Sequence, residues 1–326
     1  MSCEWSDKIF NVTAQNFTDL ALEIFHFQYG NNPVYKAFVE SLSVDVAAVK
    51  DITGIPFLPV RFFKSHSIMT TPFDPQVIFE SSGTTQTINS RHPVKDKMIY
   101  EESFLRAFIK NYGPVEDWCI LGLLPSYLQR KNSSLVYMVD KLIAFSHNPS
   151  SGFYLYNVDE LYKQLQTLEA AGQQTLLIGV TFALLDFIEK YPLTLKHTIV
   201  METGGMKGRR REMIREELHE VLCQGFAVKT IHSEYGMTEL LSQAYSKGAG
   251  IFECAPWMKV LVRDEDDPLT VKENGKGVLN VVDLASIYSC SFIATDDAGN
   301  IFDNGNFEVL GRTDGSDLRG CSLMAV

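Results

Sequence analysis

The feature of this sequence that most constrains its fold is an alternation of strand-like and helix-like segments from about residue 77 to residue 226. Residues 118–124 and 175–180 are short apolar runs of the kind found in buried strands. Between them, residues 158–171 have the apolar spacing of an amphipathic helix. Because strands that alternate with helices form a sheet covered by helix layers, we expect an α/β fold.

Two regions flank this alternation. Residues 11–50 are expected to be helical, because apolar residues recur there at helical spacing. After about residue 250, Asp- and Gly-rich turns separate short strand-like segments, which predicts a smaller, mostly β lobe. The expected domains are therefore an α/β core at residues 1–250 and a β-rich lobe at residues 251–326. Further predicted elements are helices at 95–111, 133–145, 182–189 and 209–223, and strands at 77–79, 197–201, 226–231, 258–263, 277–284 and 301–310.

Composition and charge narrow the function classes. The net charge of −11 and the pI near 5.1 argue against a nucleic-acid surface, because phosphate contacts need a basic footprint. No apolar run approaches the roughly 20 residues of a membrane span, and no secretory signal is visible at the N-terminus. The six cysteines form no C-x-x-C pair, so we expect free thiols and a cytoplasmic location.

The first segment that can carry chemistry is Ser81-Ser82-Gly83-Thr84-Thr85-Gln86-Thr87, directly after the apolar run at 77–79. Hydroxyl groups and backbone amides around one glycine can bind a polyphosphate. The segment lacks the lysine of the common phosphate-binding loop. A polar turn between a strand and a helix explains it equally well when it is taken alone.

The second segment is His232-Ser233-Glu234-Tyr235-Gly236-Met237-Thr238-Glu239, which follows the predicted strand at 226–231. Ligands bind at the carboxyl ends of strands in α/β sheets. Thr238 can donate a hydrogen bond to a phosphate, and Glu239 can hold magnesium through oxygen. The alternative is a helix N-terminus capped by a hydroxyl group.

The third segment is Thr295-Asp296-Asp297-Ala298-Gly299, followed by Gly311-Arg312-Thr313-Asp314. A carboxylate accepts hydrogen bonds from both hydroxyl groups of a ribose, and an arginine can hold the sugar or phosphate edge. The alternative is a pair of surface turns, because Asp and Gly are frequent turn residues.

In this order, the three segments resemble the adenylate-forming superfamily of acyl and aryl acid ligases and peptide-synthetase adenylation domains. That family has a Ser/Thr/Gly phosphate loop, then Tyr-Gly-x-Thr-Glu, then Thr-Gly-Asp, then Gly-Arg-x-Asp. The counterparts here are Ser81 to Thr85, Tyr235 to Glu239, Thr295 to Asp297 and Gly311 to Asp314. The resemblance implies the layered α/β lobes of the family's N-terminal domain, with a small β-rich lobe near the C-terminus.

The resemblance also implies which residues bind ATP and magnesium. Thr238 would contact a phosphate, Glu239 would hold magnesium, and Asp297 with Arg312 would bind the ribose. The loop residues Ser81, Ser82, Gly83, Thr84 and Thr85 would bind phosphates, Gly204 and Gly205 would line the adenine, and Tyr235 with Gly236 would lie beside the adenine face.

The chain departs from the superfamily pattern at three places. Thr85 is followed by Gln86 rather than by the usual Gly-x-Pro-Lys, so the loop lysine is absent and another cation such as Arg91 would replace it. Asp296 stands where the family has glycine, which leaves open whether Asp296 or Asp297 meets the ribose. The family's usual C-terminal subdomain, which supplies a second lysine, is expected to be absent.

A shorter branch of the superfamily resembles the chain throughout. Residues 80–85, 203–209, 235–239 and 311–321 are similar to the LuxE-like acyl-protein synthetases, the fatty-acid ligases of bacterial bioluminescence systems. In that family a cysteine near the C-terminus accepts the acyl group, and Cys321 is the matching position. The resemblance thus implies three catalytic residues, Thr238, Glu239 and Cys321. The alternative is that Cys321 is a small apolar residue with no role in transfer.

The expected function is ATP- and magnesium-dependent activation of a carboxylic acid to acyl-AMP with release of pyrophosphate, and a fatty acid is the expected substrate. The acyl group would then pass to a thiol, which is Cys321, coenzyme A or an acyl-acceptor protein. One alternative is an acyl- or aryl-CoA ligase, which would form no stable acyl-enzyme. The other is a non-catalytic nucleotide-binding module, which would bind ATP without releasing pyrophosphate.

Overall fold

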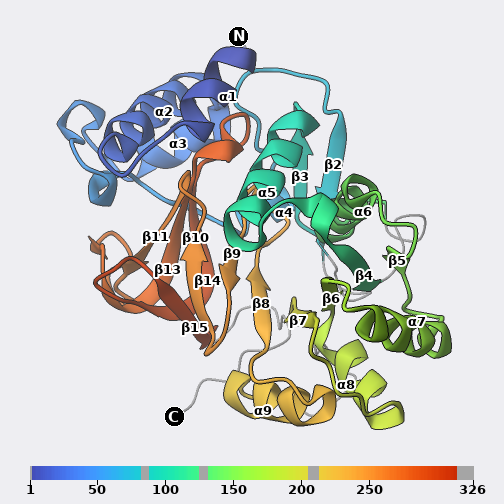
Figure 1. The fold of residues 1–326 in the computed structure, drawn as a ribbon. Helices are drawn as coiled ribbons and strands as arrows, with labels where there is room; N and C mark the ends of the chain where they lie inside the picture. The colour runs from blue at the N-terminus through green and yellow to red at the C-terminus, as the bar shows by residue number, and fades with distance from the viewer. Residues whose placement is uncertain (1, 82–87, 125–130, 205–212, 314–326) are drawn as a thin grey trace.

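The structure, a computed structural model, describes residues 2–81, 88–124, 131–204 and 213–313. In these residues one 13-stranded sheet runs through the molecule, and a two-stranded hairpin lies apart from it (Figure 1). Across the sheet, the strands follow the order β12 (Val271–Lys272), β11 (Met258–Arg263), β13 (Gly275–Asp283), β14 (Phe292–Ile301), β15 (Phe307–Arg312), β10 (Ile251–Cys254), β9 (Ala244–Ser246), β8 (His232–Tyr235), β7 (Thr198–Glu202), β6 (Thr175–Gly179), β4 (Cys119–Leu123) and β5 (Gly152–Phe153), with β1 (Leu58–Pro59) paired to β14. The hairpin consists of β2 (Val77–Glu80) and β3 (Arg91–Val94).

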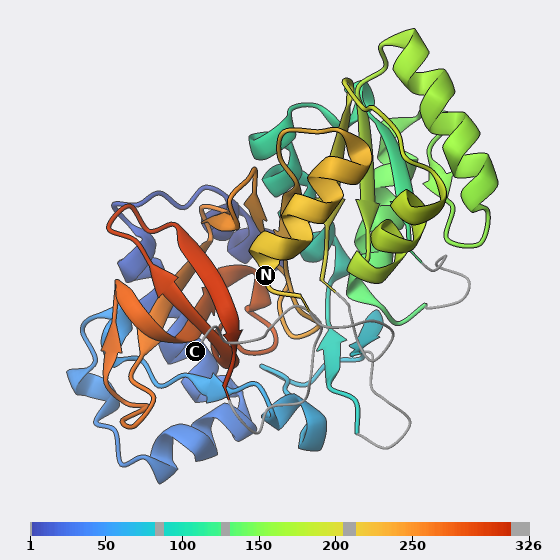
Figure 2. The same ribbon diagram turned by 90° about the horizontal axis from the view of Figure 1, so that it is seen from below.

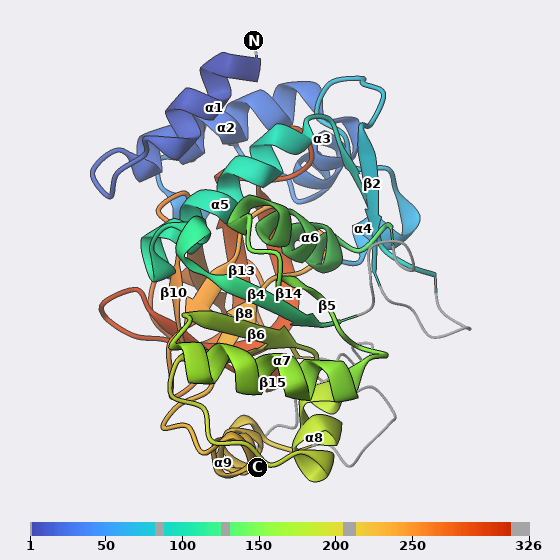
Figure 3. The same ribbon diagram turned by 45° about the vertical axis from the view of Figure 1, so that its right-hand side comes forward.

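The parallel half of the sheet lies between two helix layers (Figure 3). Strands β5, β4, β6, β7 and β8 pair in parallel, whereas the pairings from β8 to β9 and from β9 to β10 are antiparallel. One face carries α5 (Lys97–Tyr112) and α6 (Ser134–Ser146), and the other carries α7 (Val158–Ala171), α8 (Thr181–Lys190) and α9 (Arg215–Phe226).

The alternating side chains of the buried strands explain this sandwich. In β6, Leu176 and Ile178 belong to the hydrophobic cluster that includes α5 and α6, while Leu177 belongs to the cluster formed with α7, α8 and α9. Side chains of successive strand residues point to opposite faces, so a continuously apolar strand needs a helix layer on each side. The predicted α/β fold is therefore confirmed.

The N-terminal helices cover the antiparallel half of the sheet (Figures 1 and 2). Phe292 of β14 lies 6.1 Å, between ring centroids, from both Phe25 and Tyr35. Asn32 accepts a hydrogen bond from the Tyr35 N–H at 3.0 Å and caps a helix with Pro33 in its first turn, where no N–H is needed. The helices of this region are α1 (Ser2–Phe10), α2 (Phe17–Asn31), α3 (Pro33–Ser41) and α4 (Phe62–Ser65). Short 3-10 helices in the described residues are η1 (Val46–Ala48), η2 (Ile52–Gly54), η3 (Val115–Asp117) and η4 (Leu284–Ser286).

One predicted strand is wrong. The strand expected at 226–231 is absent, because Leu218, Leu222 and Phe226 continue one buried helical face to the end of α9. Strand β8 begins only at His232. The alternative of a surface turn for the acidic segment around Asp297 is excluded, because the segment lies inside the ten-residue strand β14, which pairs with β13 and β15.

One sheet crosses the predicted domain boundary at residue 250, so the division into two domains stays a prediction. Among the helices of the described residues, none combines the length and the apolar character needed to cross a membrane.

Candidate active site

Two of the predicted nucleotide segments begin at the carboxyl ends of the neighbouring parallel strands β7 and β8. In the register of β7 with β8, Glu202 lies opposite Ser233. The segment that begins Thr203-Gly204 therefore leaves the sheet beside the segment that begins Tyr235-Gly236. This edge is where α/β sheets bind ligands.

A hydrogen-bonded group of three predicted residues joins this edge to the antiparallel strands. The Tyr235 hydroxyl donates to Oδ2 of Asp297 at 2.9 Å, and Nε of Arg312 donates to Oδ1 at 3.1 Å. The side chains of Asp297 and Arg312 are only 11% and 8% exposed. The structure thus brings together Tyr235 of β8, Asp297 of β14 and Arg312 of β15.

The two neighbouring aspartates face different partners. Asp296 lies 3.4 Å from Nε of Arg61, whose side chain is 59% exposed. Consecutive residues of a strand point to opposite faces, so only one of the two carboxylates can face Tyr235. Asp297 is that residue. Arg263 stabilises strand β14 by donating hydrogen bonds to the carbonyl of Thr295 and to Oδ1 of Asn280 in the neighbouring strand β13.

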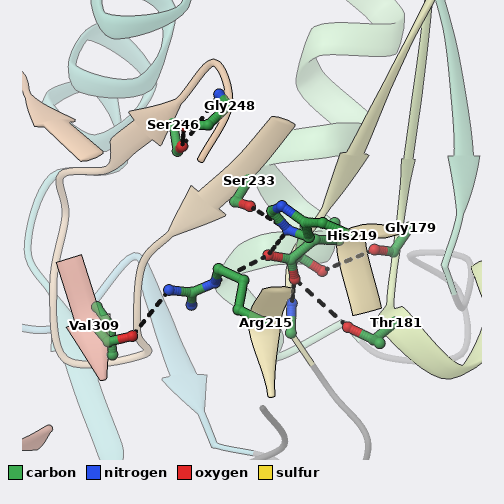
Figure 4. A network of polar contacts seen from close by, with 11 residues as sticks. Gly179, Thr181, Arg215, His219, Ser233, Ser246, Gly248 and Val309 are labelled. Atoms are coloured by element: carbon green, nitrogen blue, oxygen red, sulfur yellow. Dashed lines mark hydrogen bonds and ion pairs between the residues drawn. The ribbon is translucent and has the colours of Figure 1, made fainter. Parts of the chain in front are cut away.

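The segment after β7 is held by a buried polar network around Glu202, to which Thr181, Arg215 and His219, labelled in Figure 4, contribute. The carboxylate accepts hydrogen bonds from the Gly204 N–H at 2.7 Å and from the Thr181 hydroxyl at 3.5 Å. Nε2 of His219 lies 3.6 Å from it, and Nε of Arg215 lies 3.9 Å from it. These contacts join the start of the glycine segment to the first two turns of α9.

Glu202 keeps its charge although it is buried. Burial by itself raises the pKa of this carboxyl, but the contact with His219, the charge of Arg215 and the Gly204 N–H hold it at about 2. The backbone of Gly204 has a φ of 72°, which is unfavourable for other residues. An ionised acceptor and a glycine together set the direction in which the chain leaves β7.

The segment after β8 turns back at Thr238 and Glu239. The side chain of Glu239 is fully buried, and Asp283 accepts a hydrogen bond from the Leu241 N–H at 2.7 Å. The Thr238 carbonyl lies 2.8 Å from Nδ1 of His92. Burial lowers the pKa of His92 to about 4, against the opposing effects of the Thr238 carbonyl and the Glu239 charge.

The predicted magnesium ligand is the single carboxylate of Glu239. No group of three or more His, Cys, Asp and Glu side chains in the described parts of the chain is arranged to hold a metal ion. Magnesium is usually bound by one or two carboxylates together with substrate phosphates and water. Glu239 stays the predicted protein ligand of an ion that would arrive with ATP.

The hairpin of β2 and β3 carries the predicted phosphate loop. The Ser81 N–H donates to the Ser90 carbonyl at 3.1 Å, and the Ser90 N–H donates to Oγ of Ser81 at 2.9 Å, so Ser81 closes the hairpin. Arg91, the expected replacement cation, is exposed and lies 3.4 Å from Glu80. The predicted residues Ser82, Gly83, Thr84, Thr85, Gly205 and Cys321 lie outside the described residues.

Comparison with known proteins identifies the family. The family described as acyl-protein synthetase, LuxE, matches residues 3–325. The chain belongs to the LuxE family. This membership confirms the family predicted from the sequence and the predicted enzyme class, an AMP-forming acid ligase.

Individual relatives agree with this assignment. The long-chain-fatty-acid–luciferin-component ligase of Aliivibrio fischeri is 21% identical over 347 residues, which cover 98% of this chain and 89% of that protein. A 2-hydroxyisobutyryl-CoA ligase in an open conformation with 2-HIB-AMP and CoA has a TM-score of 0.64 at 10% identity, over 96% of this chain and 78% of that chain.

A shorter match is the ATP-bound MatB of Rhodopseudomonas palustris, with a TM-score of 0.55 at 18% identity over 75% of this chain. The match spans 49% of the MatB chain, so this LuxE-family protein corresponds to about half the length of that relative. At these identities the solved structures establish the fold, and they confirm the predicted fold of the N-terminal domain of adenylate-forming ligases.

Sequence reasoning missed three residues that support the site in this LuxE-family chain. Glu202, His92 and Arg263 touch the predicted site residues or their backbone, but the sequence interpretation gave none of them a role. Glu202 directly precedes the predicted glycine segment, and His92 follows the predicted phosphate loop by a few residues. This proximity is the one signal that could have drawn attention to them. Arg263 carries no such signal.

Glu234, which immediately precedes Tyr235, is expected to make stability depend on pH. Burial, followed by the negative charge of Glu202, raises the pKa of Glu234 from 4.5 to about 8. Its Oε1 would lie 2.5 Å from a Cβ at residue 236, so Gly236 leaves room for the carboxyl group. Between the two pKa values the folded state holds a proton that the unfolded state has lost, so the free energy of unfolding falls as pH rises.

We therefore expect Glu234→Gln to stabilise the protein relative to wild type by about 1 kcal/mol per pH unit between pH 5 and pH 8, with little difference at pH 5. Urea unfolding at pH 5, 6.5 and 8 measures this. Glu253→Gln, at a glutamate that pairs with Lys110, corrects for the loss of one negative charge. A stability difference that does not grow with pH would contradict the prediction.

Proposed function

We propose that this protein uses ATP and magnesium to activate a fatty acid as acyl-AMP, with release of pyrophosphate, and then transfers the acyl group to a thiol. The observation that carries the proposal is the buried carboxylate of Asp297, held by Tyr235 and Arg312 beside the turn at Thr238 and Glu239. Membership of the acyl-protein synthetase family supports the same reaction.

Asp297 has the remaining capacity to bind a ribose. A carboxylate offers about four lone-pair positions, and Tyr235 and Arg312 each use one. Two sugar hydroxyl groups can donate to the others. Because Tyr235 and Arg312 fix the orientation of the carboxylate before the nucleotide arrives, binding requires little further ordering of the side chain.

The activation step depends mainly on the positioning of the acid and ATP. The carboxylate oxygen of the acid attacks the α-phosphorus of ATP in line, a new P–O bond forms, and the bond from this phosphorus to pyrophosphate breaks. Thr238 would hold a phosphate oxygen, and Glu239 would hold the magnesium ion. When bound, the ion would supply charge neutralisation at the phosphates.

The second step transfers the acyl group. We propose that the thiolate of Cys321 attacks the carbonyl carbon, so that a thioester forms while the C–O bond to AMP breaks. Coenzyme A or an acyl-acceptor protein would accept the acyl group next. The name of the Aliivibrio fischeri relative, a long-chain-fatty-acid ligase, supports a fatty acid as the substrate.

The test is pyrophosphate release with ATP, magnesium and hydroxylamine over acids from acetate to palmitate, together with aryl acids. Release that depends on one class of acid, with formation of its hydroxamate, is the expected result. Aryl acids as the preferred substrates would replace the fatty acid in the proposal. ATP binding without release for every acid would overturn the proposal in favour of a non-catalytic nucleotide-binding module.

Replacing Cys321 by serine is expected to separate the two steps. Pyrophosphate release in the presence of hydroxylamine should stay within about 3-fold of wild type, because activation does not use the thiol, whereas labelling of the protein by radioactive fatty acid should disappear. Cys223→Ser, at a partly exposed cysteine of α9, is the matched control and should keep the label. Equal labelling of the Cys321 variant and wild type would remove Cys321 from the mechanism.

A further inference from the structure

His92 occupies a position between the phosphate-loop hairpin and the turn at Thr238. It lies in β3, is 1% exposed, and packs its ring edge-on against Phe63 at 5.5 Å between centroids. Nδ1 lies 2.8 Å from the Thr238 carbonyl, and Nε2 lies 2.8 Å from Oγ of Ser289. Both ring nitrogens therefore have partners at good hydrogen-bonding distance.

The chemistry of the partners fixes which nitrogen carries the proton. A carbonyl oxygen can only accept, so Nδ1 must be the donor to Thr238. In the neutral ring Nε2 is then an acceptor, and the Ser289 hydroxyl, which also lies 3.3 Å from the Ser286 carbonyl, donates to Nε2 at the shorter distance of 2.8 Å. His92 is thus held as a single tautomer, with one bond to the site and one bond to the scaffold.

Ser289 is a fixed anchor for this ring. Its carbonyl accepts hydrogen bonds from Nδ2 of Asn32 at 2.8 Å and from Oγ1 of Thr70 at 2.6 Å. The buried residues Asn32 and Thr70 come from the N-terminal part of the chain. The Thr238 carbonyl is consequently connected through His92 to a rigid polar cluster that includes no predicted nucleotide-binding residue.

The other end of the same turn is held separately. Asp283 accepts hydrogen bonds from the Leu241 N–H at 2.7 Å and from Oγ of Ser242 at 2.5 Å. Glu239 lies between these two anchors, which are the Thr238 carbonyl on one side and the Leu241 N–H on the other. Loss of the His92 contact would therefore release one end of the turn and leave the other attached.

We propose that His92 is a positioning residue of the ATP site, whose Nδ1–H fixes the Thr238 carbonyl and thereby the directions of the Thr238 hydroxyl and the Glu239 carboxylate. The inference rests on the proposed function for the roles of Thr238 and Glu239. It adds that the hairpin carrying the phosphate loop and the turn carrying the magnesium ligand are aligned by one side chain. A purely structural role predicts that activity follows stability, whereas a positioning role predicts that activity follows the bond to Thr238.

Two substitutions of His92 test the two hydrogen bonds of its imidazole ring separately. In His92→Asn the side-chain amide stands near the position of Nδ1 and can still donate to the Thr238 carbonyl. In His92→Gln the amide reaches the position of Nε2 and keeps only the contact with Ser289. Ser289→Ala removes that second contact while leaving His92 and the bond to Thr238 in place, and so serves as the control for the scaffold side.

The full-length protein is used for each variant, with the proposed substrate acid, ATP and magnesium. We expect His92→Gln to lower kcat for pyrophosphate release by about 10-fold or more, because small displacements of reacting groups have large rate effects. His92→Asn and Ser289→Ala should each lose less than about 3-fold. Urea unfolding should show similar stability losses for His92→Asn and His92→Gln.

Two readouts do not depend on turnover. Calorimetry with ATP and magnesium should show weaker binding for His92→Gln than for His92→Asn, and ring ¹⁵N NMR of wild type should show the tautomer protonated at Nδ1. If wild type binds ATP but releases no pyrophosphate, the proposed function fails and the calorimetric order still decides the inference. Equal losses for the two His92 variants, the reverse order, or a ring protonated at Nε2 would overturn it.

Discussion

Asp297→Ala is expected to lower kcat/KM for ATP by about 100-fold. The variant loses the carboxylate to which both ribose hydroxyl groups would donate, and two hydrogen bonds to a charged acceptor contribute about 3 kcal/mol. That free energy corresponds to about 100-fold in a binding constant. Initial rates of pyrophosphate release at varied ATP concentrations measure the effect.

The same substitution is expected to destabilise the protein, because it removes the carboxylate that faces the buried guanidinium of Arg312. Breaking a buried ion pair from one side costs about 3 to 5 kcal/mol. Assays should therefore be run at a temperature where circular dichroism shows that the variant is folded.

Asp296→Ala is the matched control for Asp297→Ala. It removes a neighbouring carboxylate whose partner Arg61 is largely exposed, and exposed ion pairs contribute about 0 to 1 kcal/mol. We expect kcat/KM for ATP to stay within about 5-fold of wild type. A larger loss for Asp296→Ala than for Asp297→Ala would assign the ribose to Asp296 and contradict the geometry of Tyr235 and Arg312.

Glu239→Gln is expected to lower the rate of pyrophosphate release by about 100-fold or more, and to shift the magnesium dependence to higher concentrations. Glutamine keeps the volume of this fully buried side chain but removes the charge that would hold the metal ion. A magnesium ion contributes several kcal/mol of charge stabilisation to phosphoryl chemistry, and about 1.4 kcal/mol corresponds to 10-fold in rate.

Magnesium titrations of the steady-state rate test this second prediction. Glu253→Gln changes a glutamate of β10 whose side chain is 52% exposed and pairs with Lys110, and its magnesium dependence should match wild type. An unaltered magnesium dependence in Glu239→Gln would exclude Glu239 as the metal ligand, whatever happens to the rate.

The parallel half of the fold was predictable because its signals are local. Residues 118–124 and 175–180 are apolar without interruption, and they form β4 and β6 between two helix layers. The helix at 158–171 also appears where its spacing predicts it. Each of these segments can be recognised from its own side chains, since burial on one face or on both leaves a distinct apolar period.

Strand β14 shows where local signals fail. Its central residues Asp296, Asp297 and Gly299 are frequent in turns, yet all lie in a strand. Gly299 pairs with both β13 and β15, whereas Asp297 pairs with β15 where the register with β13 shifts. Strand pairing supplies hydrogen bonds to the backbone from residues remote in sequence, and side chains such as Arg61 and Arg312 compensate the two carboxylates. Tertiary context overrides the weak local preference of such residues.

By itself, the sequence determined the α/β class, the order of the motifs and the residue types that a nucleotide and a metal ion would need. Only the tertiary structure decided that Asp297 rather than Asp296 meets Tyr235 and Arg312, and that His92 and Glu202 hold the backbone on which these motifs lie. The physical reason is that a motif reports the chemical groups along one segment. The direction of each group depends on strand register and on partners that folding brings from distant parts of the chain.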